Sequence, residues 1–169
     1  MKRLAPVLPA LLLMALPLAG CGLKPLYSGG TASPVAQGLA NVDVAPIEGK
    51  AGWLVRNALV DRLGAAGGSG QTARYRLDVR LDDRLEGLGI LSNDSISRER
   101  RTLRARYQLV DTATGEIVHD ATAGSDAGID VVSSEYATIA AEQTALENLS
   151  RDVADRIVTA LSQQFLDRR

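Results

Sequence analysis

Residues 73–82 read ARYRLDVRLD, and this stretch decides the fold. Apolar side chains occupy every second position from Ala73 to Leu81, and arginines and aspartates fill the positions between them. A period of two residues indicates a β-strand with one apolar and one polar face. Such a strand belongs to an antiparallel or mixed sheet that is covered on one side.

Three more strands are expected around this one. Residues 98–110, RERRTLRARYQLV, repeat the alternation, and the turn DTATG at 111–115 leads into a return strand over 116–123. A short strand is expected at 41–45, before Pro46. The segment between the two arginine-rich strands, EGLGILSNDSIS at 86–97, is expected to be a loop with an apolar centre.

Two helices complete the pattern. Residues 50–63 carry an apolar stripe at helical spacing, with Gly64 as the stop, and residues 135–167 carry another without any Gly or Pro. The order is therefore β-α-β-β-β-α. We predict an α+β fold, a two-layer sandwich with two helices packed on one face of a four-stranded mixed sheet.

The N-terminal residues have a different composition. Lys2 and Arg3 precede an apolar run from Leu4 to Leu18, which is typical of a secretory signal and is short for a membrane-spanning helix. The run ends in Leu-Ala-Gly-Cys at 18–21, which resembles the bacterial lipobox. The resemblance implies cleavage before Cys21 and acylation of that cysteine. The residue after it is Gly22, and this resembles the usual sorting pattern of lipoproteins that are exported to the outer membrane.

Domain boundaries follow from these features. We predict a lipoprotein signal peptide at 1–20, a lipidated N-terminus and flexible tether at 21–40, and a single α/β domain at 41–169. The tether is rich in Gly, Ser, Ala and Pro and shows no sustained period.

The residue inventory argues against an enzyme. The single histidine, His119, falls on an expected strand, where it is expected to pack or to face solvent, and the single cysteine is Cys21. No Gly-x-Ser-x-Gly, phosphate-binding glycine loop or His-Glu-x-x-His motif occurs. The acidic cluster of Asp82, Asp83 and Glu86 is expected to be solvated. We expect no catalytic residue, no metal site and no cofactor apart from a covalent lipid on Cys21.

The positions of the charged residues are more informative than the net charge. The chain has 169 residues and a formal net charge of −1, which argues against a general binder of nucleic acid. Arginines nevertheless gather on the expected strands, and if these strands are neighbours one open sheet face carries the guanidiniums of Arg74, Arg76, Arg80, Arg104 and Arg106. Guanidiniums bind phosphate groups through paired hydrogen bonds. The candidate anion-binding residues are Arg74, Arg76, Arg98, Arg100, Arg101, Arg104 and Arg106. The alternative is a solvated face that discourages aggregation of sheet edges.

Several segments together resemble the LPS-assembly lipoprotein family LptE, in its alphaproteobacterial form. They are CGLKPLY at 21–27, RNAL at 56–59, YRL at 75–77, RARYQLVD at 104–111 with Gly115, and SEYA at 134–137 before the long last helix. The resemblance covers nearly all of the chain after Cys21. It implies a two-layer sandwich, as the pattern itself predicts.

The resemblance also implies a function. LptE-like proteins plug the outer-membrane barrel LptD, assist its assembly, and bind lipopolysaccharide during insertion into the outer leaflet. We therefore expect a lipid-anchored protein on the periplasmic side of the outer membrane, with the candidate arginines as the lipopolysaccharide site. An auxiliary lipoprotein of a periplasmic lipid-transport ABC system is the alternative, and a catalytic periplasmic lipoprotein is disfavoured by the residue inventory.

Overall fold

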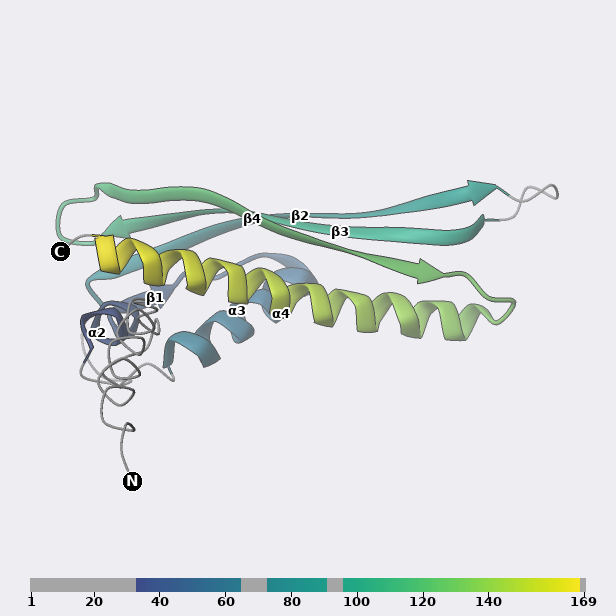
Figure 1. Ribbon diagram of the computed structural model, residues 1–169, viewed down its shortest axis with the longest axis horizontal. Helices are drawn as coiled ribbons and strands as arrows, with labels where there is room; N and C mark the ends of the chain where they lie inside the picture. Colours follow the sequence, from purple (N-terminus) through teal and green to yellow (C-terminus); the bar gives the residue numbers. More distant parts are fainter. Residues whose placement is uncertain (1–32, 65–72, 91–95, 168–169) are drawn as a thin grey trace, which may run out of the picture.

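The computed structural model describes residues 33–64, 73–90 and 96–167. The predicted signal peptide, Cys21 and most of the predicted tether therefore lie outside the described residues. The described elements follow one another along the chain in the order drawn in Figure 1: α2 (Pro34–Ala40), β1 (Val42–Val44), α3 (Gly49–Gly64), β2 (Tyr75–Ile90), β3 (Ile96–Asp111), β4 (Ile117–Asp130) and α4 (Glu135–Asp167).

The four strands form one mixed sheet in the order β1-β2-β3-β4. Three-residue β1 is parallel to the start of β2, and the other neighbours are antiparallel. In the long β2–β3 pair, Arg80 lies opposite Arg106 and Leu81 lies opposite Ala105. Over residues 75–82 and 103–109, the alternation seen in the sequence thus places the apolar side chains on one face and the charged side chains on the other. The predicted α+β fold with a four-stranded mixed sheet is confirmed.

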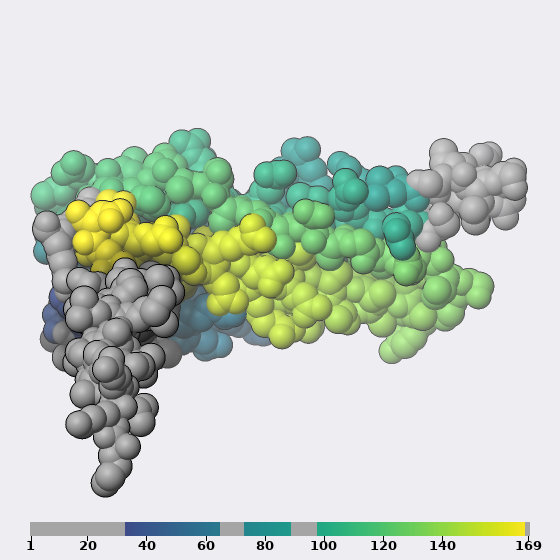
Figure 2. All heavy atoms as spheres, viewed as in Figure 1, coloured from purple at the N-terminus to yellow at the C-terminus, as the bar shows by residue number. Residues whose placement is uncertain are grey.

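The core lies between the sheet and the helices. Leu77 and Leu103 from the sheet are fully buried in the same cluster as Leu59 of α3 and Ile157 of α4. Helix α4 runs along almost the full length of the sheet, whereas α3 covers only the end that holds β1 (Figure 1). In the space-filling view of Figure 2, α4 forms a continuous yellow-green ridge along the elongated molecule.

The described residues before β1 contain a helix. Residues 34–40, which were predicted to belong to the flexible tether, form helix α2, and the Ser33 side chain caps it by accepting a hydrogen bond from the Ala36 N–H at 3.1 Å. Val35 and Leu39 are buried in the core. Gly38 lies so close to α4 that a Cβ there would be 2.8 Å from Cγ of Phe165. A helix of seven residues, with three buried apolar positions, is too short to show a clear helical period in the sequence.

The hairpin strands are longer than predicted. Most of the segment 86–97, expected to be a loop, belongs to β2 and β3, since β2 continues to Ile90 and β3 starts at Ile96. Strand β4 likewise continues past Ala123 to Asp130. The extensions contain Gly87, Gly124 and Gly128, which weaken the strand pattern in the sequence, and they are stabilised by pairing with β3 instead.

Gly52 of α3 marks the closest approach of this helix to the preceding loop. A Cβ at this position would lie 2.6 Å from the carbonyl oxygen of Ile47, a backbone atom that has no rotamer to change. We expect Gly52→Ala to lower the free energy of unfolding by about 1–3 kcal/mol, measured by urea denaturation. Gly64→Ala is the matched control, because a Cβ there meets nothing within 4 Å. Equal stability of the two variants would contradict the close packing of α3.

Candidate functional site: an arginine-lined groove on the outer face of the sheet

The outer face of the sheet is the face turned away from α3 and α4. It carries the even-numbered side chains of β2 and β3, because residues opposite each other in an antiparallel pair point to the same side. Asp82 lies opposite Arg104, and Glu86 lies opposite Arg100. Strand β4, at the edge of the sheet, also carries aspartates. The arginine-rich strand β3 therefore lies between β2, whose charges are mixed, and β4, whose charges are acidic.

Much of the charge on the outer face is neutralised by ion pairs. Each pair joins an arginine nitrogen to an aspartate oxygen: Arg76 to Asp78 at 3.0 Å, Arg84 to Asp82 at 2.9 Å, Arg98 to Asp130 at 2.9 Å and Arg106 to Asp120 at 2.9 Å. Hydrogen bonds from Arg106 and then from Gln108 lower the pKa of Asp120, so this carboxylate stays charged in mildly acidic solution. Such exposed pairs contribute little to stability, but they leave these four arginines less able to bind an anion from solution.

Three arginines of this face have no such partner. Within the described parts of β2, β3 and β4, no ion pair or hydrogen bond engages the guanidiniums of Arg80, Arg100 and Arg104, and all three side chains are exposed. Two carboxylates that line the same hollows, Asp78 and Asp82, are held by Arg76 and Arg84 instead. These three guanidiniums are therefore free to bind an anion from solution.

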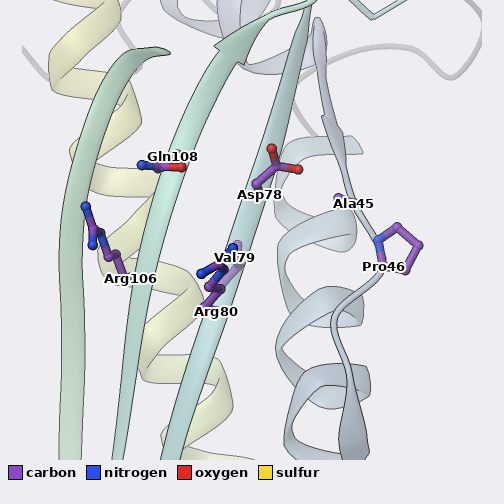
Figure 3. Close-up of a pocket in the computed structure, with 7 residues that line it drawn as sticks. All are labelled: Ala45, Pro46, Asp78, Val79, Arg80, Arg106 and Gln108. Carbon is purple, nitrogen blue, oxygen red and sulfur yellow. The ribbon is translucent and has the colours of Figure 1, made fainter.

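The same three arginines line a chain of shallow hollows. The proximal hollow, of about 490 Å³, lies where β1 ends and contains Arg80, Arg106, Asp78, Gln108, Ala45 and Pro46 (Figure 3). The middle hollow, of about 360 Å³, contains Arg80, Arg104, Arg106, Asp82 and Thr122. The distal hollow, of about 310 Å³, contains Arg100, Arg104, Asp82, Arg84, Glu86 and Thr102. Because neighbouring hollows share Arg80, Arg106 or Arg104, they form one continuous surface, which we call the arginine groove.

One glycine of β4, Gly124, lines the middle hollow of this groove. Gly124 lies opposite Arg104, and Gly128 lies opposite Arg100. A Cβ on Gly124 would approach Cγ of Arg104 to 3.2 Å. A glycine inside a strand often marks a place where a ligand or another chain comes close to the backbone. This signal is present in the sequence, although sequence reasoning did not use it to locate the site.

The structure divides the arginines that the sequence grouped together. Arg100, Arg104 and Arg106 lie in the groove, and Arg80 joins them. Arg74, Arg76 and Arg98 lie outside the hollows and are paired with aspartates. Arg101 is on the opposite face, where its side chain is only 16 % exposed and its guanidinium donates hydrogen bonds to Asp83 at 2.7 Å and to the Glu142 carbonyl oxygen of α4 at 3.1 Å.

The acidic cluster and the lone histidine are also separated. Asp82 and Asp83 point to opposite faces of β2 and pair with different arginines. The ring of His119 lies 5.7 Å from that of Tyr107, between their centroids, and its Nε2 is buried without a hydrogen-bond partner. In the portion of the chain that is described, no group of three or more metal-ligating side chains occurs. The described helices likewise include none with the length and apolar character needed to cross a bilayer.

Solved structures of three bacterial lipoproteins are among those that share this fold. A crystallographic structure of a candidate lipoprotein from Caulobacter crescentus CB15 is 26% identical, with a TM-score of 0.65, and the match covers 81% of this chain and 98% of that one. A minor lipoprotein from Acinetobacter baumannii is 17% identical with a TM-score of 0.57, covering 72% and 91%. The rare lipoprotein B from Shewanella oneidensis is 10% identical with a TM-score of 0.56, covering 75% and 96%. The last two show the fold alone.

Sequence comparison identifies the family directly. No curated protein matches the chain in a sequence search. The family model described as "LptE: Lipopolysaccharide-assembly", however, matches residues 39–161, from the end of α2 to the last turns of α4. This range includes every strand and the whole arginine groove. The chain therefore belongs to the LptE family of lipopolysaccharide-assembly lipoproteins, which are not enzymes.

Proposed function

We propose that this chain is an outer-membrane lipoprotein subunit of the lipopolysaccharide translocon. In this proposal Cys21 carries the lipid anchor on the periplasmic side, and the domain plugs the LptD barrel and assists its assembly. The arginine groove binds lipopolysaccharide during its insertion into the outer leaflet. Family membership supports the role in lipopolysaccharide assembly. The lipobox-like segment at 18–21 supports the lipid anchor on Cys21.

The observation that carries ligand binding is the pair of free guanidiniums in the middle hollow. Arg80 on β2 and Arg104 on β3 line the same hollow, and neither is paired within the described residues. Lipopolysaccharide presents phosphate groups, which guanidiniums bind bidentately with charge-assisted hydrogen bonds. A free cation in a preformed hollow binds such a group without first breaking an ion pair of the protein.

The partner is tested by purification of the tagged full-length lipoprotein from membranes in mild detergent. We expect a large outer-membrane barrel to co-purify, and the complex to sediment with outer-membrane fractions. Recovery of an inner-membrane ABC transporter in place of the barrel would contradict the proposal and favour the auxiliary lipoprotein of a lipid-transport system.

Ligand binding is tested by removing the two free charges of the middle hollow. We expect Arg80→Gln with Arg104→Gln to weaken binding of lipopolysaccharide about 10- to 100-fold, since a hydrogen bond to a charged group contributes about 1.5–3 kcal/mol. The measurement is calorimetric titration of the detergent-solubilised protein. The matched control is Arg151→Gln with Arg156→Gln, which makes the same charge change on α4. Equal weakening in both double variants would show that only net charge matters.

A further inference from the structure

The arginine groove contains few apolar side chains. Val79, Leu81, Ala105 and Ala123 contribute to its walls, but they are odd-numbered residues whose side chains belong to the helix-facing side of the sheet. Among the described lining residues, that leaves only Ala45 and Pro46, at the proximal end. Sites that hold lipid chains are lined mainly by apolar surface, because burial of apolar area is what stabilises them.

The large apolar side chains that are exposed lie elsewhere. None of those in the described residues lines any of the three hollows. They belong to α3, to the helix-facing side of β2, to the start of β4, to the connection between β4 and α4, and to the first turns of α4: Trp53, Val60, Leu85, Ile117, Val132, Tyr136 and Ile139. An acyl chain placed in the groove would therefore meet charged side chains and water.

The polar lining suits a ligand that is rich in hydroxyl groups. Each hollow combines a free arginine with a carboxylate: Arg80 with Asp78, Arg104 with Asp82, and Arg100 with Glu86. A carboxylate accepts hydrogen bonds from hydroxyls but repels anions. Gln108, Thr122 and Thr102 add one neutral polar group to each hollow. A polyanion would fit this mixture poorly, whereas a sugar chain with a few phosphate groups would use both charges.

The length of the groove fits the same class of ligand. It extends along β3 from Gln108 to Arg100, and a strand rises about 3.3 Å per residue, so the groove is about 26 Å long. Shared lining residues make the three hollows continuous. A single phosphate would fill only a small part of this length, whereas several linked sugar rings would occupy it.

We infer that the arginine groove binds the phosphorylated saccharide part of the ligand and leaves the acyl chains outside the site. This inference rests on the proposed function, which makes lipopolysaccharide the ligand. The phosphates lie against Arg80, Arg104 and Arg100, and the sugar hydroxyls donate to the carboxylates between them. The acyl chains extend away from the polar face of the sheet.

Calorimetric titration of the full-length lipoprotein, in one detergent, with three probes tests this inference. The probes are intact lipopolysaccharide, the fully deacylated oligosaccharide that retains its phosphates, and the same oligosaccharide after dephosphorylation. We expect the deacylated probe to bind within about threefold of the intact molecule, and dephosphorylation to weaken binding at least about tenfold. Arg104→Gln should weaken the first two probes by the same factor.

The outcomes separate this inference from the proposed function. Binding of the intact molecule with at least tenfold weaker binding of the deacylated probe would overturn the inference, because acyl chains would then be recognised, and ligand binding itself would stand. Equal binding of the second and third probes would overturn the role given to the phosphates. If none of the three probes binds, ligand binding in the proposed function is wrong.

Discussion

Leu103→Ala is expected to lower the free energy of unfolding by about 2–5 kcal/mol. Leu103 lies in β3 next to Arg104, on the helix-facing side, and none of its surface is exposed. Removal of its branched end leaves a cavity between the sheet and the helices that the surrounding side chains fill only in part. Urea denaturation followed by circular dichroism measures the change as a lower midpoint with an unchanged slope.

Leu85→Ala provides the control for this experiment. Leu85 is on the same side of the neighbouring strand, but α3 does not reach this end of the sheet and the side chain is 44 % exposed. The identical chemical change should therefore cost less than about 1 kcal/mol, as for most partly exposed positions. Similar losses for both variants would mean that the uneven helix cover has no effect on stability.

Cys21→Ala is expected to abolish labelling with palmitate and to weaken the attachment of the protein to the membrane, which then depends on contacts with the barrel alone. Cys21 lies outside the described residues and is the only cysteine of the chain. Each buried CH₂ of an acyl chain contributes about 0.8 kcal/mol, and firm attachment takes more than one chain. Because no second cysteine is available, removal of Cys21 removes every site for this modification. Fractionation of cells and radiolabelled palmitate measure the two effects.

Ser28→Ala is the control in the same segment, since it changes a small polar residue without touching the acceptor thiol. It should leave labelling and membrane attachment unchanged. Persistent labelling of the Cys21→Ala protein would contradict lipidation at this residue. Loss of both properties in Ser28→Ala would indicate that the segment as a whole, and not the thiol, is required.

The fold was predictable wherever one face of an element is apolar over its whole length. The alternation at 73–82 and the stripe at 135–167 predicted β2 and α4, and α4 has the predicted bounds. The prediction failed where local residues do not specify the structure. Residues such as Gly124 and Gly128 have low strand propensity, and cross-strand pairing with β3 extends β4 through them.

The sequence predicted that the candidate site is rich in arginine, but it did not predict which arginines form the site. The alternation placed Arg104 and Arg106 on the polar face, whereas it could not show which guanidiniums are already paired. That depends on aspartates from other strands, such as Asp120 and Asp130 of β4, whose register with β3 is set by the hairpin. Arg101 shows the same limit, because its partner Asp83 and the Glu142 carbonyl oxygen become neighbours only in the folded sandwich.

The contact between α2 and the last turns of α4 has a consequence for folding. Val35 is the first buried apolar residue of the described chain and Leu39 follows it in the same helix, and Gly38 packs against Phe165, near the end of α4. Closing so long a loop costs chain entropy before any contact compensates for it, and contacts of this kind slow folding. Among the described elements, α2 is therefore synthesised first, and it packs against the end of the element that is synthesised last. Until Phe165 is in place, these apolar side chains stay exposed and available to a chaperone.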